Sequence, residues 1–228
     1  MRIPVPHLLG LTLFLSGVGL SATAPYRGIV AIDVLGISRV TYGAVMTGGA
    51  IAGAILSVLL GYLADRVGDR RPLVLLTALA GVIGYGLIFL VPTPLMFIAS
   101  TALILPLAQA IISQSFSYSR AWYTDHNPEQ GEYAISVLRT WFSVAWVVVP
   151  PLAGALAAGQ SPIAVFGAAA LASVLIAGTY LHLGHRQDAV TTPPPKRVAA
   201  EGQRPGLPPD RIIGIFGVLM TRTALFLH

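Results

Sequence analysis

Long apolar runs separated by short polar stretches dominate the chain from His7 to Leu183. A helix that crosses the hydrocarbon core of a bilayer needs about 20 mostly apolar residues. Six runs meet this requirement, and each predicts a membrane-spanning helix. They cover residues 7–32, 41–64, 73–91, 95–118, 135–158 and 162–183. The sequence therefore predicts an all-α membrane protein whose first part, residues 1–183, is a six-helix transmembrane bundle.

Polar or proline-rich stretches mark the expected connections. Residues 92–94 read Pro-Thr-Pro and separate the third run from the fourth. Residues 120–132 contain Asp, Asn, Pro and Gly and predict a polar loop before the fifth run, with Arg120 ending the fourth helix.

The character of the chain changes after the sixth run. Residues 184–210 are rich in proline and charge, and they predict a cytoplasmic linker. Residues 211–228 are again apolar and predict the start of a seventh membrane helix. Since the chain stops within this segment, the sequence is interpreted as the N-terminal half of a longer protein.

Composition agrees with a membrane protein. Hydrophobic residues make up 55% of the chain and charged residues 10%, whereas an average soluble domain has about 25% charged residues. The lipid bilayer is therefore the expected environment. The net charge is +5, but the basic residues fall in short loops between apolar runs, so no nucleic-acid partner is expected. The first apolar run lacks a signal-peptide cleavage site and predicts a retained helix.

The distribution of lysine and arginine predicts the orientation. If the N-terminus is cytoplasmic, only Arg27 and Arg39 fall on the outer side, and the basic residues of the other connections and of the linker fall on the cytoplasmic side. This is the asymmetry of the positive-inside rule. Arg27 and Asp33 then lie near the outer end of the first helix, where a surface role is expected.

Glycines recur at helical spacing in two of the predicted helices. Gly49 and Gly53 form a G-x-x-x-G pair, and Gly81, Gly84 and Gly86 interrupt the third run. Small residues at such spacing allow close helix packing. The alternative is that glycine is simply common in membrane helices.

The segment between the second and third runs reads GYLADRVGDRR, residues 61–71. It resembles the signature loop of the major facilitator superfamily, although Asp69 stands where that loop usually has a basic residue. The resemblance implies the N-terminal bundle of a major facilitator fold. It also implies a cytoplasmic gating loop formed by Gly61, Asp65, Arg66, Gly68, Arg70 and Arg71. The alternative is a topogenic turn of positive charge.

The fifth run contains WVVVPPLAG, residues 146–154. This is similar to an element in the fifth helix of efflux-type major facilitators, with Pro150 in place of the usual glycine. Pro150 and Pro151 remove two backbone donors, so they predict a helix bend near Gly154.

Residues 114–128 and 136–154, together with Ala24-Pro25, resemble bacterial sugar efflux transporters. The resemblance implies a secondary active transporter of the bacterial plasma (inner) membrane. It would export sugars or sugar-like molecules by alternating access, with protons as a candidate coupling ion. The alternatives are drug or metabolite efflux and an inactive, truncated half-transporter.

By the architecture of that family, the first and fourth helices line the substrate cavity. Gln109, Ser113 and Ser117 are spaced by four residues and predict a polar stripe. Amides and hydroxyls suit a neutral polyhydroxy ligand, and aromatic rings could stack on a sugar. The alternative for serine is a bond to its own helix backbone. The candidate substrate-binding residues are Tyr26, Gln109, Ser113, Gln114, Phe116, Arg139 and Trp146.

Arg139 has three interpretations: it binds substrate, it pairs with a carboxylate such as Glu132, or it extends to the membrane surface. Catalytic chemistry is not expected, because the chain has no cysteine and no recognisable catalytic cluster. His182 and His185 lack a third metal ligand. Neither an enzyme activity, a cofactor nor a metal is predicted.

Overall fold

The computed structural model describes residues 3–67 and 69–191, except for the side chain of Asp65. Gly68, most of the predicted linker and the predicted start of a seventh helix lie outside these residues. The part of the chain that the structure describes contains six helical stretches long and apolar enough to cross a membrane. The predicted six-span all-α bundle is therefore confirmed.

Four spans are each formed by a single α-helix, and the other two are assembled from several helical pieces. The first span consists of α1 (Val5–Thr23), α2 (Tyr26–Gly28) and the π-helical η1 (Ile29–Val34). The fourth span consists of α5 (Pro94–Ala99), the π-helical η2 (Ser100–Ile104), α6 (Leu105–Gln109) and α7 (Ile111–His126). The remaining spans are α3 (Arg39–Arg66), α4 (Arg71–Leu90), α8 (Gly131–Gly159) and α9 (Ala164–Gly184).

The predicted polar loop over residues 120–132 is wrong. Helix α7 continues to His126, a 3-10 turn (η3, Pro128–Gln130) follows, and α8 begins at Gly131. Arg120 therefore lies within α7 and does not end it. Residues 120–126 contain no glycine or proline that would stop the helix. Polar side chains do not oppose a helix that has left the hydrocarbon region, so the change in polarity does not mark a helix end.

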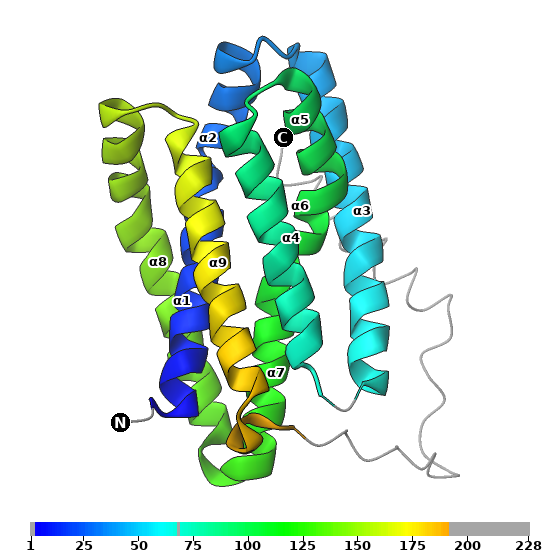
Figure 1. Cartoon of the computed structure of the whole chain (residues 1–228), viewed down its shortest axis with the longest axis vertical. Coiled ribbons are helices and arrows are strands. Elements are labelled where there is room, and N and C mark those ends of the chain that lie inside the picture. The colour runs from blue at the N-terminus through cyan, green and yellow to red at the C-terminus, as the bar shows by residue number, and fades with distance from the viewer. Residues whose placement is uncertain (1–2, 68, 192–228) are drawn as a thin grey trace, which may run out of the picture. The chain divides into compact units, whose positions relative to one another are not determined.

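The interior of the bundle is formed mainly by four helices. Helix α4 packs along α9, and α1 packs against both α8 and α9. Figure 1 shows α8 and α3 at opposite edges of the bundle, with α1, α9 and α4 between them. The apolar window of the α3 span is only 6% buried, against 61% for the α1 span. Most of the α3 surface is thus available for lipid or for another protein segment.

Glycines allow the closest helix contacts, as the spacing predicted. A Cβ atom added at Gly81 would lie 2.6 Å from Ser173 Oγ, and one at Gly84 would lie 2.7 Å from Leu105 Cδ2. Gly86 differs, because a Cβ there would meet nothing within 4 Å. Close packing therefore depends on two of the three glycines of α4.

Candidate functional site

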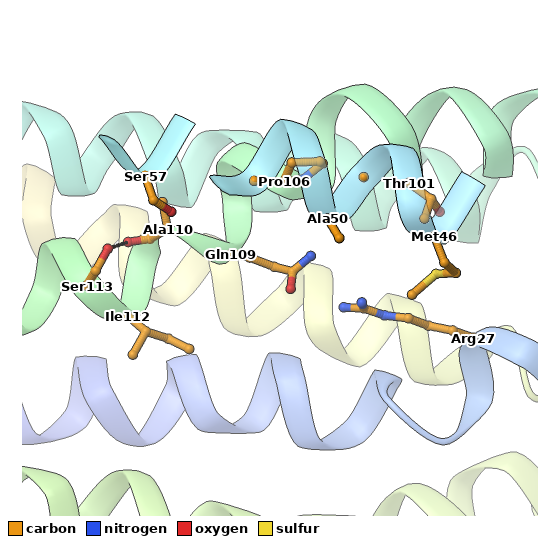
Figure 2. A pocket seen from close by; sticks show the side chains of 12 residues that line it. Arg27, Met46, Ala50, Ser57, Thr101, Pro106, Gln109, Ala110, Ile112 and Ser113 are labelled. Atoms are coloured by element: carbon orange, nitrogen blue, oxygen red, sulfur yellow. Dashed lines mark hydrogen bonds between the residues drawn. The ribbon is translucent and has the colours of Figure 1, made fainter. Parts of the chain in front are cut away.

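A polar cavity of about 430 Å³ opens between α2, α3, α6 and α7. This volume lies within the range of about 300–1,000 Å³ that is typical of small-molecule sites. Figure 2 shows the side chains that line it. They include Arg27, Met46, Ser57, Thr101, Gln109 and Ser113.

The wall between α3 and the fourth span is set by a glycine. A Cβ atom at Gly49 would lie 2.9 Å from the backbone oxygen of Thr101. Thus α3 approaches η2 closely because Gly49 has no side chain, which confirms the close packing predicted for this glycine. Pro106 lies one residue into α6, and its missing N–H breaks the regular α-helical ladder beside η2. π-helical segments of this kind occur often at functional sites.

Arg27 is the charged residue of the cavity wall. It is only 8% exposed, and its Nε and Nη2 atoms have no hydrogen-bond partner among the described residues. In Figure 2 its guanidinium and the side chain of Gln109 extend toward one another from α2 and α6. The surface role expected for Arg27 is therefore wrong. Residues of α3 and of the fourth span line the same cavity as Arg27, so its side chain lies inside the bundle.

Two of the predicted substrate-binding residues, Gln109 and Ser113, line this cavity. Ser113 Oγ also donates a hydrogen bond of 2.9 Å to the backbone oxygen of Ala110. Ser117 lies elsewhere: Arg70 Nη1 donates to its hydroxyl and, at 3.3 Å, to its carbonyl oxygen. The predicted three-residue stripe therefore lies only partly on the cavity wall, since Gln109 and Ser113 line it on either side of Ala110 and Ser117, further along α7, binds Arg70.

The other predicted candidates do not line the polar cavity. Gln114 is 3% exposed, and its Oε1 has no hydrogen-bond partner among the described residues. Phe116 packs against the main core cluster, and Trp146 is exposed. The hydroxyl of Tyr26 lies 3.7 Å from the Cβ position of Gly154, so the first and fifth spans meet there. Their substrate contacts remain predictions.

Arg139 lines a second cavity of about 570 Å³, together with Arg120 and Glu132. No ion pair between Arg139 and Glu132 is found in the described structure. A third cavity, of about 430 Å³, lies between α1, α7 and α8 and has an aromatic wall that includes Phe14, Tyr133 and Trp141. The rings of Phe14 and Trp141 meet edge to face with their centroids 6.3 Å apart.

The predicted gating segment, residues 61–71, is attached to the end of α9. Arg71 Nε donates to both carboxylate oxygens of Asp69, at 2.9 and 2.8 Å. Arg71 Nη1 donates to the backbone oxygens of Leu183, at 2.6 Å, and Arg186, at 3.1 Å. Asp69, the residue that departs from the signature loop, is thus the counter-ion of Arg71. Within the same segment, the Arg66 guanidinium lies 4.1 Å from the centre of the Tyr62 ring.

The residues that follow α9 are held against α7. Tyr118 donates a hydrogen bond of 2.6 Å to the Ala189 oxygen, and Trp122 Nε1 donates one of 2.8 Å to the Asp188 oxygen. The side chains of Arg186 and Asp188 form an ion pair, and Arg186 Nη1 also donates to the Ile3 oxygen at 2.6 Å. We call residues 69–71, 118, 122 and 183–189 the polar clasp.

Two further expectations concern α8 and metals. Helix α8 remains one α-helix through Pro150 and Pro151, and the bend predicted there stays a prediction. Across residues 3–67 and 69–191 no group of three or more histidine, aspartate and glutamate side chains could hold a metal ion.

Sequence reasoning missed Arg27, Thr101, Met46 and Ser57 as cavity residues. For Arg27 a signal was present, because a charge inside a predicted span is usually functional. The other three residues became neighbours only through the approach of α3 to the fourth span, which the sequence alone does not specify.

Comparison with known proteins agrees with the helical arrangement. The sequence model of the Major Facilitator Superfamily matches residues 9–227. The chain is 36% identical over 173 residues to a putative sugar efflux transporter of Deinococcus radiodurans, which covers 75% of the chain and 44% of the relative. It is 31% identical over 187 residues to sugar efflux transporter C of Escherichia coli, covering 81% of the chain and 47% of the relative. The matches thus span less than half the length of these relatives.

Proposed function

Since this chain belongs to the Major Facilitator Superfamily, we propose that it forms one wall of the solute cavity of a secondary transporter that exports sugars or sugar-like molecules. It is a multi-pass membrane protein, and its polar cavity is the observation that carries the proposal. Transporters of this class bind substrate near the bilayer midplane between two halves. Gln109 lies near the middle of the fourth span, as a residue of such a site should.

The chemistry of the cavity wall supports a polyhydroxy ligand. Gln109 supplies an amide that both donates and accepts hydrogen bonds, and Ser57, Thr101 and Ser113 supply hydroxyls. Such groups can match the donors and acceptors of a sugar. The names of the relatives point to the same class of solute.

Alternating access is the mechanism that follows from this assignment. In the proposed cycle the two halves rock about the cavity, and residues 61–71 control access from the cytoplasmic side. The polar clasp supports this role, because it fixes the C-terminal end of the gating segment to α9 and leaves residues 61–67 as the part that can change partners. We further propose a cytoplasmic N-terminus in the bacterial inner membrane, with protons as the coupling ion.

A second candidate function rests on the aromatic cavity near Trp141. Its wall of Phe14, Tyr133 and Trp141 suits a flat, apolar compound better than a sugar. Export of drugs or other metabolites is therefore the competing assignment.

Retention of radiolabelled glucose and lactose tests the assignment in cells that express the complete open reading frame. The wild-type protein is expected to lower retention. Gln109→Leu should slow export about tenfold, because it removes hydrogen bonds to the ligand. Gln160→Leu, at the end of α8, is the matched control and should export normally. Unchanged retention of both sugars with the wild-type protein would refute export of neutral sugars. Cells that express only these 228 residues decide whether the six spans transport without further segments.

A further inference from the structure

Arg27, Arg71 and Arg186 differ in what contacts the edge of the guanidinium group that is formed by Nε and Nη2. In Arg71 this edge holds the Asp69 carboxylate, with Nε 2.8 Å and Nη2 2.7 Å from Oδ2. In Arg186 the same edge holds the Asp188 carboxylate, with Nε 2.9 Å from Oδ1 and Nη2 2.5 Å from Oδ2. In Arg27 the same two atoms are buried and have no hydrogen-bond partner among the described residues.

An arginine in this situation needs an anion. The guanidinium group stays protonated in proteins, so Arg27 cannot become neutral to reduce the cost of burial. A buried charge is tolerated when it is paired or hydrogen-bonded. The two donors of the Nε–Nη2 edge match two oxygens of a carboxylate or a phosphate. Arg27 therefore has the geometry of an anion-binding group.

Protein groups near Arg27 do not meet this need in the described structure. Asp33, which lies on the same span six positions further, is exposed, and no ion pair joins it to Arg27. Arg27 instead faces the polar cavity, where its guanidinium and the Gln109 side chain extend toward one another (Figure 2). An oxygen-rich group placed between them would be contacted from both sides.

We propose that Arg27 and Gln109 form an anion subsite, and that the transported solute is a sugar derivative with one carboxylate or phosphate group. This inference rests on the proposed function and narrows its substrate class. Arg27 binds the two anionic oxygens through Nε and Nη2. Gln109 donates to the same group or to a neighbouring hydroxyl, and Ser57, Thr101 and Ser113 contact the rest of the sugar.

Binding to the complete protein in lipid nanodiscs tests the proposal. Apparent Kd values are measured from ligand-dependent thermal shifts at constant ionic strength. The probes are glucose, glucuronate, glucose 6-phosphate and inorganic phosphate. The variants are Arg27→Met, which removes the charge, and Arg27→Lys, which keeps it but lacks the two-donor edge. Arg39→Met is the matched control, since Arg39 is an exposed arginine at the start of α3.

The wild-type protein should bind at least one anionic sugar at least about tenfold more tightly than glucose. Arg27→Met should abolish this preference by weakening the binding of the anionic sugar far more than that of glucose, whereas Arg39→Met should keep it. Arg27→Lys should retain only a preference of a few-fold. If Arg27→Met does not fold, Arg27→Lys alone tests the proposal. A fully retained preference in that variant would overturn the claim that the anion is bound by the Nε and Nη2 donors together.

The remaining outcomes separate this inference from the proposed function. Equal affinity for glucose and both anionic sugars would overturn the anion subsite and leave sugar export standing. A preference that survives Arg27→Met would also overturn the subsite. Arg27-dependent binding of inorganic phosphate as tight as that of glucose 6-phosphate, without glucose binding, would keep the anion site and refute the sugar assignment.

Discussion

Arg71 in the polar clasp and Arg27 in the polar cavity are buried to nearly the same degree, with 9% and 8% of their surface exposed. Their surroundings differ completely. Arg71 has a carboxylate on one edge and two backbone oxygens at Nη1. The Nε–Nη2 edge of Arg27 has no hydrogen-bond partner among the described residues.

The difference separates an arginine whose charge is paired within the fold from one that, in our proposal, serves the solute. The clasp uses its charge to join residues 69–71 to the end of α9, so its interactions are complete within the fold. The cavity keeps a charge that the described fold does not neutralise. Burial alone therefore does not distinguish the two arginines, whereas the hydrogen bonds of their Nε and Nη2 donors do.

The largest expected effect comes from removing the arginine of the clasp. Arg71→Met leaves the Asp69 carboxylate without its cation, and the oxygens of Leu183 and Arg186 keep only backbone N–H donors, at 3.1 and 3.4 Å. Because Asp69 is partly exposed, water compensates some of the loss, and we expect unfolding to become easier by about 2–4 kcal/mol. Equilibrium unfolding in mixed detergent micelles measures this change. Arg39→Met is the control and should change stability little; an equal loss in both variants would contradict the structural role of Arg71.

The wall of the cavity can be tested with neighbouring glycines of α3. An alanine at position 49 would place its Cβ 2.9 Å from the Thr101 oxygen, whereas one at position 48 would meet nothing within 4 Å. Gly49→Ala should therefore destabilise the protein by about 1–3 kcal/mol. Gly48→Ala should be neutral or stabilising by up to about 1 kcal/mol, because alanine favours the helix. The same unfolding assay compares the two, and equal effects would show that α3 does not approach η2 this closely.

A smaller effect is expected from an uncharged bond of the clasp. Tyr118→Phe removes the donor to the Ala189 oxygen and leaves that oxygen without its partner. The expected loss of stability is about 1 kcal/mol. Tyr133→Phe is a matched control, because Tyr133 is 74% exposed. A loss for Tyr118→Phe as large as that for Arg71→Met would mean that the clasp depends on packing and hydrogen bonds more than on charge.

The two regions also differ in how far the sequence predicts them. The spans were predictable because each requires about 20 apolar residues, and the signature at residues 61–71 indicated the family that comparison shows. The pairing of Asp69 with Arg71 was not predicted, since the sequence showed only a departure from the family pattern. Gln109 was predicted as a polar residue within an apolar span. Arg27 was misplaced because hydropathy alone does not show which neighbouring helices cover its side chain.

The smallest expected change in stability is the most informative about Arg27. The charge of Arg27 is not paired with any described residue. Arg27→Met replaces it with an apolar side chain of similar length. Such a replacement avoids the cost of burying the charge and creates no unpaired partner, so stability should stay constant or rise by about 1 kcal/mol or less. Unfolding in the same micelles, beside Arg71→Met, measures the contrast. If Arg27→Met instead destabilised the protein as strongly as Arg71→Met, a protein carboxylate outside the described residues would be its partner, and the cavity would resemble the clasp. If stability is kept while anion binding is lost, Arg27 serves the solute and not the fold.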